Sequence, residues 1–181
     1  MVSHKTQSHQ KILTRLAEQD AQHIHRQFPS MRAILEKDSD GGMQKIAISV
    51  FDHWLRDASE WHLMNITDSM ERNRRNQSME AHWASLFDLT PIYTPRWRGR
   101  WPGKAKLTLK RYTSRDGFLA QSRFSPSKAP TQFIILPEQG CIYAAGWDDT
   151  NVLYFQNRDN AQPVIQLAVA AGLCVLHFDE T

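Results

Sequence analysis

The sequence lacks the features that would place it in a membrane or secreted class. Its most apolar stretch, Val164 to Leu176, has 13 residues and is interrupted by Gln166, whereas a membrane-spanning helix needs about 20. The first ten residues contain no apolar segment of the kind found in secretion signals. The two cysteines, Cys141 and Cys174, are flanked by apolar residues. We therefore expect a cytoplasmic protein with reduced, buried thiols and no membrane partner.

Sequence motifs for metal or nucleotide sites are also missing. No CxxC pair and no Cys/His cluster occurs, so a structural zinc site is not expected. The glycines at 99 and 103 have three residues between them, and Ala105 follows Lys104. A phosphate-binding P-loop has four residues between its glycines and a Ser or Thr after the Lys. We therefore do not expect a conventional nucleotide triphosphatase, and we expect no cofactor.

Acidic residues are almost absent from one part of the chain. Residues 94–128 hold ten Lys or Arg and a single acid, Asp116, although the whole chain of 181 residues has a net charge of only +3. Residues 129–181 hold one basic residue, Arg158, and six acids. Such a block of one charge sign indicates function more than fold, because it creates a local field that attracts an oppositely charged partner.

Hydrophobic periodicity predicts helices in the first 90 residues. The expected helices cover residues 6–28, 31–37 and 43–65, with a fourth from the cap at Thr67 or Asp68 to the region before Pro91. The segment 43–65 has a wide apolar face that includes Trp54 and Trp61 at a seven-residue spacing. Glu71, three residues after Asp68, completes a capping-box pattern for the fourth helix.

Strand patterns dominate after Pro91. Residues 107–113 alternate like a strand, residues 114–117 are typical of a hairpin turn, and residues 118–124 would form the return strand. Further strands are expected at 133–136, 141–147, 152–156 and 173–178, with a helix from the turn at 157–160 to Ala171 that Gly172 ends. The predicted fold class is α+β, with a helical N-terminal half (three to four helices) followed by a mostly antiparallel sheet with one C-terminal helix. The regions 1–90 and 91–181 form either two units or one integrated domain.

The basic segment, residues 93–128, also carries aromatic side chains. Lys and Arg neutralise phosphates and release counterions, and Trp and Tyr can stack on unpaired bases. Pro95, Pro102 and two glycines disfavour a regular helix before residue 106, so we expect an exposed loop that leads into a strand. The candidate nucleic-acid-binding residues are Arg96, Trp97, Arg98, Arg100, Trp101, Lys104, Lys106, Lys110, Arg111, Tyr112, Arg115 and Arg123.

Two other interpretations of this segment stay open. Its arginines can pair with the acids of residues 129–181, which would make the charge block a matter of internal matching. It can also bind an acidic protein partner, which would make the protein an inhibitor or adaptor. The leading hypothesis is a nucleic-acid-binding protein without enzymatic activity that contacts phosphates and unpaired bases of DNA or RNA.

The alternative with enzymatic activity is a small Mg²⁺-dependent nuclease or related phosphoryl-processing enzyme that uses the same basic track. Such an enzyme needs carboxylates to hold the metal and a base to activate water. The candidate residues are Asp148, Asp149, Asp159, His177 and Asp179. Turn chemistry and a polar C-terminus explain these residues without a catalytic role, so no catalytic set is assigned.

Overall fold

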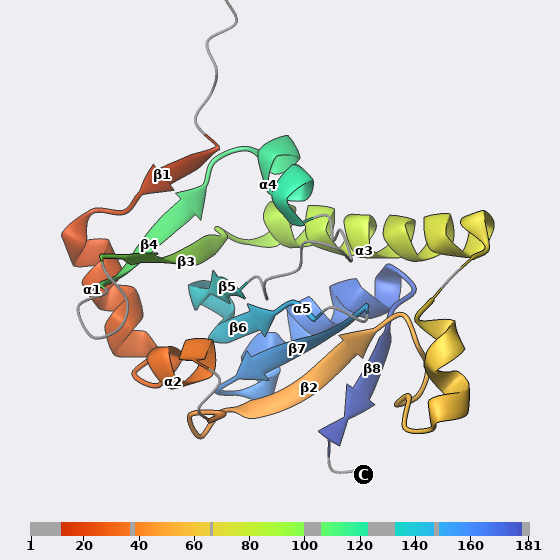
Figure 1. Cartoon of the computed structure of the whole chain (residues 1–181). Coiled ribbons are helices and arrows are strands. Elements are labelled where there is room, and N and C mark those ends of the chain that lie inside the picture. The colour runs from red at the N-terminus through yellow and green to blue at the C-terminus, as the bar shows by residue number, and fades with distance from the viewer. Residues whose placement is uncertain are drawn as a thin grey trace, which may run out of the picture.

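In the computed structural model the chain forms an eight-stranded sheet with helices on both faces (Figure 1). The structure describes residues 12–36, 39–65, 67–99, 106–122, 133–146 and 149–178. The strand order is β1-β4-β3-β5-β6-β7-β2-β8, and the described pairings are antiparallel. The strands are β1 Leu13–Arg15, β2 Gln44–Ser49, β3 Tyr93–Arg98, β4 Lys106–Tyr112, β5 Phe133–Leu136, β6 Cys141–Ala144, β7 Thr150–Phe155 and β8 Cys174–His177.

The helices confirm the predicted α+β class. They lie mainly before β3, and one long helix stands near the C-terminus. The α-helices are α1 Glu18–Gln27, α2 Met31–Glu36, α3 Ser69–Leu89, α4 Arg115–Ser122 and α5 Arg158–Ala170, and the 3-10 helices are η1 Ala58–Leu63 and η2 Pro137–Gln139. Among the described residues, no helix is both long enough and apolar enough to cross a membrane.

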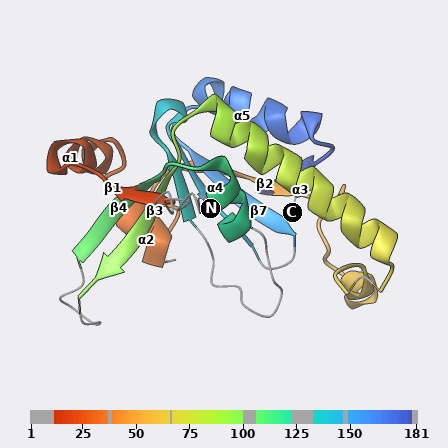
Figure 2. The ribbon, with the colours of Figure 1, turned by 90° about the horizontal axis from the view of Figure 1, so that it is seen from above.

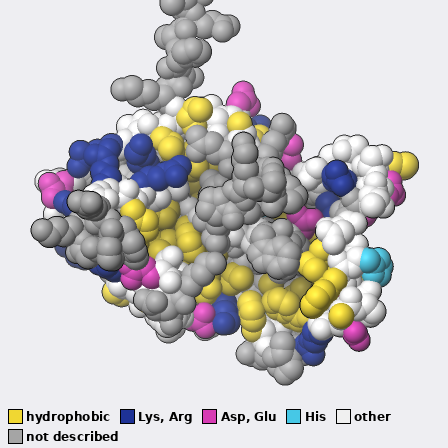
Figure 3. Space-filling view, viewed as in Figure 1, with side chains coloured by type: hydrophobic (Ala, Val, Ile, Leu, Met, Phe, Trp, Pro, Cys, Tyr) yellow, Lys and Arg dark blue, Asp and Glu magenta, His cyan; other side chains and the backbone are white. Residues whose placement is uncertain are grey.

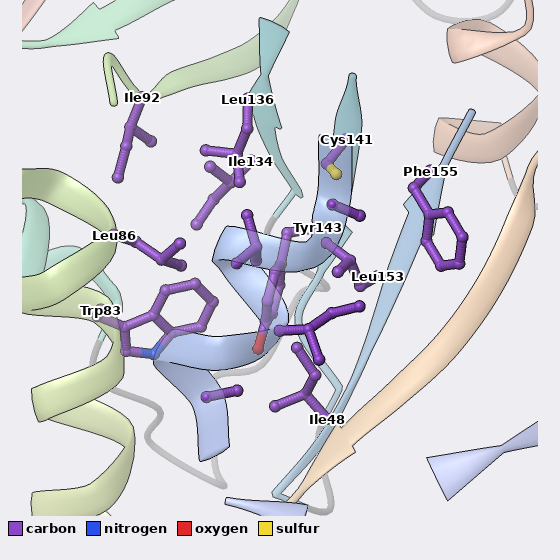
Figure 4. Packing of buried hydrophobic residues seen from close by; sticks show 14 of the residues in the cluster. Ile48, Trp83, Leu86, Ile92, Ile134, Leu136, Cys141, Tyr143, Leu153 and Phe155 are labelled. Atoms are coloured by element: carbon purple, nitrogen blue, oxygen red, sulfur yellow. The ribbon is translucent and has the colours of Figure 1, made fainter. Parts of the chain in front are cut away.

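The larger core lies between one face of the sheet and the helices α3, α4 and α5. Trp83 and Leu86 of α3 meet Tyr143 of β6 and Leu153 of β7, all of them buried (Figure 4). The Trp83 and Tyr143 rings are 4.6 Å apart in an edge-on arrangement. Full burial of one large apolar side chain contributes about 1.5–3 kcal/mol, so this cluster holds α3 and α5 against the sheet.

The smaller core lies on the opposite face, under α1 and α2. Ile24, Met31 and Ile34 from these helices pack on Leu109 of β4 and on residues of β5 and β6. Successive side chains of a strand point to opposite faces, and β5 illustrates this because Ile134 belongs to the larger core and its neighbour Ile135 to the smaller one. Both faces of the central strands are therefore buried.

The predicted helix over residues 43–65 is wrong. This segment contains strand β2 and, after a stretch of irregular chain, the 3-10 helix η1. β2 lies between β7 and β8 and pairs with β7 over its whole length and with β8 from Ile46 to Ser49. Ile46 and Ile48 alternate into the larger core. The long-range pairing outweighs the helical spacing of the apolar residues, because a strand bonded on both sides satisfies its buried backbone groups and buries apolar side chains as well.

Two other segments also differ from the prediction. The helix expected over residues 6–28 is strand β1 followed by the shorter α1, with residues 6–11 outside the described part of the chain. Residues 118–122 of the expected return strand belong to helix α4, which begins because Ser114 Oγ accepts the Gly117 amide at 3.2 Å as a helix cap. Residues 123 and 124 lie outside the described part of the chain. The hairpin partner of β4 is the preceding strand β3.

Elements with strong local signals match the predictions. Asp68 accepts the Met70 amide at 2.9 Å and caps α3, although Glu71 binds Arg74 and Arg75 instead of completing a capping box. The side chain of Asn157 caps α5. Gly172 follows α5 with φ +78°, a conformation that favours glycine. Strand β5 has the predicted bounds, and β6, β7 and β8 lie within a few residues of theirs.

Candidate nucleic-acid interface

The first half of the basic segment forms the β3–β4 hairpin. Residues 93–98 of the predicted exposed loop are strand β3 instead, and residues 100–105 lie outside the described part of the chain. The register pairs Arg98 with Lys106, Arg96 with Thr108 and Tyr93 with Arg111. Paired residues share a face of the sheet and neighbours along a strand do not. The hairpin therefore divides its side chains into two sets, one on each face of the sheet.

Four of the predicted residues lie outside the described part of the chain: Arg100, Trp101, Lys104 and Arg123.

One set of side chains is a group of cations. Arg96 and Arg98 of β3 share a face with Lys106 and Lys110 of β4, and β1 adds Arg15, which pairs with Lys110. We call these five residues the cation face. Four of the five are exposed and Lys110 is half-buried. Figure 3 shows Lys and Arg side chains gathered at the end of the molecule where Figure 1 draws β1, β4 and β3.

The cation face continues the sheet surface that α3, α4 and α5 cover elsewhere. Leu13 and Tyr112 point the same way as the cations and pack in the larger core. β3 and β4 extend past these helices (Figure 2), so their outer residues stay open to solvent. Thr108 lies on the same face, and its Oγ1 donates to the Arg96 carbonyl oxygen at 2.9 Å across the hairpin.

The other face of the hairpin is aromatic and faces α1 and α2. Trp97 lies on it, 38% exposed, with the Arg32 guanidinium 5.5 Å from the ring centroid. Arg32 is also ion-paired with Glu36 at 3.0 Å. Arg111 points to the same face as Trp97, away from the cation face. The structure therefore separates Trp97 and Arg111 from the other predicted contacts.

Tyr112 has a structural position. Its side chain is 2% exposed, and its ring packs edge-on against Phe118 of α4 with centroids 4.9 Å apart. Tyr93 is half-buried against the smaller core. The buried Tyr112 ring therefore offers no open face for stacking on a base.

The charges of the cation face are not matched by the described acids. Within the described residues, no ion pair of 4.0 Å or less involves any of its five side chains. Arg98 stands directly opposite Lys106, and Arg15 directly opposite Lys110. Like charges at directly opposite strand positions are destabilising. The acids Glu138 and Asp149 of the C-terminal third have other partners: Glu138 accepts from Thr90, and Asp149 lies 3.8 Å from Arg75.

Arg115 is not part of the sheet surface. It is the first residue of α4, and its guanidinium lies 3.4 Å from the Asp88 carboxylate of α3. Residues 118–122 of the expected return strand belong to the same helix, and Arg123 lies outside the described residues.

The candidate catalytic residues are spread over separate elements. Asp149 precedes β7 with φ +58°, Asp159 stands in the first turn of α5, and His177 ends β8. β8 is the edge strand six spacings from β4 in the sheet order, which is roughly 29 Å along the sheet. Asp148 and Asp179 lie outside the described residues. In the described ranges, no three His, Cys, Asp or Glu side chains are grouped so that they could hold a metal ion.

Sequence reasoning missed Arg15. It lies about 80 residues before the basic segment and was placed in a helix. The only signal would have been the pairing of β1 with β4, which no local pattern reveals.

No protein-family model, curated protein or solved structure matches this chain.

Proposed function

We propose that this protein binds nucleic acid, with the cation face on the phosphates. The observation that carries the proposal is the pairing of Arg98 with Lys106 and of Arg15 with Lys110 on one exposed surface, with no ion-pair partner among the described acids. A polyanion relieves this repulsion, and its bound counterions are released as the phosphates are neutralised. Folded proteins keep locally unfavourable arrangements where a function requires them.

The proposal assigns different roles to the predicted contacts. Arg96, Arg98, Lys106 and Lys110 contact phosphates or base edges together with Arg15, whereas Tyr112 supports the core. Stacking on unpaired bases was expected from the aromatic residues of the segment. Of these, Trp97 faces α2 and Tyr112 is buried, so phosphate contact is the part of the hypothesis that the geometry supports. A cytoplasmic location belongs to the same proposal.

The test is fluorescence anisotropy of labelled single- and double-stranded oligonucleotides titrated with the full chain at several salt concentrations. The triple variant Arg96→Gln/Arg98→Gln/Lys106→Gln should bind all sequences at least tenfold more weakly, because each lost phosphate contact also removes counterion release. A matched control is Arg26→Gln/Arg111→Gln/Arg158→Gln, which removes three exposed cations that lie off the cation face. The control should retain most of the affinity.

Three results would contradict the proposal. If no oligonucleotide binds at low salt, the cation face would instead be interpreted as a site for an acidic protein partner. Equal losses in the two triple variants would show that net charge, and not this face, determines affinity. Mg²⁺-dependent cleavage of the oligonucleotide on a denaturing gel would replace a binding protein with a nuclease.

A further inference from the structure

We infer that the cation face takes double-helical DNA and lies across its major groove, with its two cation pairs on the two phosphate backbones. The inference rests on the proposed function and names its substrate class. It is carried by the spacing of the cations, by what lies between them, and by the side to which the aromatic residues point.

The cations form two groups at the two ends of the face. Arg98 and Lys106 are one directly opposed pair, and Arg15 and Lys110 are the other. Lys106 and Lys110 are four residues apart on β4, which places the groups about 13–14 Å apart at 3.3–3.4 Å per residue. The major groove of B-form DNA is about 12 Å wide, which is close to the distance between the two groups. Each group can therefore meet one of the two backbones that border the groove.

The hairpin has the freedom to approach the groove. β3 and β4 extend beyond α3, α4 and α5 (Figure 2), and Arg96, Arg98 and Lys106 at their outer part are exposed. The helices α1 and α2 support the hairpin from behind. This support keeps the ribbon rigid while its cation face stays open.

Arg96 and Thr108 lie between the two groups and are directly opposite each other. In the bound arrangement they face the base edges on the floor of the groove. A guanidinium can donate two parallel hydrogen bonds to the O6 and N7 atoms of guanine, which is the commonest specific contact in the major groove. Arg96 is thus the residue that would read sequence, whereas the four flanking cations contact phosphates and position the ribbon.

The opposite placement of the aromatic residues favours a duplex over a single strand. Proteins that bind single strands combine a basic groove with aromatic rings on which bases stack. On the described part of the cation face there is no exposed ring: Trp97 lies on the other face, and Tyr112 is buried. An RNA duplex is disfavoured as well, because the major groove of the A-form is too narrow and deep for side chains to read.

The first experiment needs no variant. The wild-type chain is titrated against a DNA duplex, a DNA single strand and an RNA duplex of one sequence and length. We expect the DNA duplex to bind on the order of tenfold tighter than either alternative. Four phosphate contacts predict a slope of about −3.6 for log K against log salt concentration. Equal affinity for the three ligands would overturn the duplex inference but leave the proposed function standing, and failure to bind any of them would overturn both.

The second experiment tests the orientation of the ribbon in the groove. Lys106→Gln/Lys110→Gln should change the salt slope to about −1.8, whereas the control Arg26→Gln/Arg111→Gln should leave it unchanged. Replacing guanine by 7-deazaguanine removes the N7 acceptor from the major groove and should weaken binding of the wild type but not of Arg96→Gln. If 7-deazaguanine has no effect on the wild type, Arg96 does not read this edge. If the two double variants have the same slope, the two backbones are not contacted as inferred.

Discussion

Arg98 and Lys106 are direct partners across the β3–β4 hairpin, and both side chains point to the same exposed face of the sheet. Directly opposed residues have their Cβ atoms about 4.5–5.5 Å apart, so the two charges repel each other in the folded protein. The pair of cations therefore lowers the stability of the fold, whereas it favours the proposed binding of nucleic acid. A substitution at Lys106 can separate these two effects.

Lys106→Glu should stabilise the fold and weaken nucleic-acid binding. The introduced carboxylate would replace a repulsion with an attraction to Arg98, which we expect to contribute roughly 0.2–1 kcal/mol to the free energy of unfolding, while nucleic-acid affinity falls. Urea unfolding followed by circular dichroism measures the first effect and anisotropy the second. Arg111→Glu is the control, because its cross-strand neighbours are Thr14 and Tyr93 and not cations. A loss of stability in Lys106→Glu would contradict the repulsion.

Trp83→Ala should destabilise the protein by about 3–5 kcal/mol, because it leaves a cavity in a core that cannot close around it. Trp83 is 3% exposed and contacts the rings of Tyr143 and Phe118. The midpoint of urea unfolding gives the measurement. Trp61→Ala is the matched control, since Trp61 is 55% exposed and its removal should change stability by about 0.5 kcal/mol or less. Similar losses in both variants would show that the larger core does not depend on α3 as described.

Acid should weaken the fold through His82. Burial lowers the pKa of His82 to about 4, opposed in part by the Leu167 backbone, and the ring packs beside those of Trp83 and Tyr143. Since the ordinary value is 6.5, the unfolded chain binds this proton more readily than the folded one. The contribution of neutral His82 to the free energy of unfolding is therefore present above pH 6.5. It decreases by about 3 kcal/mol as the pH drops to 4.

The variant His82→Leu separates this effect from other acid-sensitive groups. No hydrogen bond of good geometry reaches either ring nitrogen, so an apolar side chain of similar size should be tolerated at neutral pH. The free energy of unfolding between pH 7 and pH 4.5 should then depend less steeply on pH than in the wild type. An unchanged slope would assign the acid sensitivity to a different residue.

The contribution of His53 to stability should depend on pH in the opposite direction to that of His82. Its Nδ1 lies 2.6 Å from Asp52 and its Nε2 lies 2.9 Å from Glu60, and these hydrogen bonds raise the pKa of His53 above its ordinary value. The charged ring stabilises the fold below pH 6.5, and this contribution is lost as the pH rises through the folded-state pKa. An NMR titration of the imidazole should show the raised value, and Glu60→Gln should lower it. A wild-type pKa at or below 6.5 would contradict the double contact.

Local signals predicted the elements whose ends are set by neighbouring residues. The cap at Asp68 and the sequence from Asn157 to Gly172 placed α3 and α5 correctly, because caps act within one helical turn. Local signals failed at β2, where the apolar residues of 43–65 fit a helix as well as a strand. They also failed at Ser114, where one short polar segment suits both a hairpin turn and a helix cap.

The sequence alone determined that ten cations and one acid would lie within residues 94–128, since charge composition does not depend on folding. It also determined which residues could cap helices. Only the tertiary structure decided that Arg15 joins Lys110, that Trp97 and Arg111 turn away from Arg96 and Arg98, and that Arg115 meets Asp88. The reason is physical: a one-residue change of strand register moves every side chain to the other face. That register is set by pairing between segments far apart in the chain.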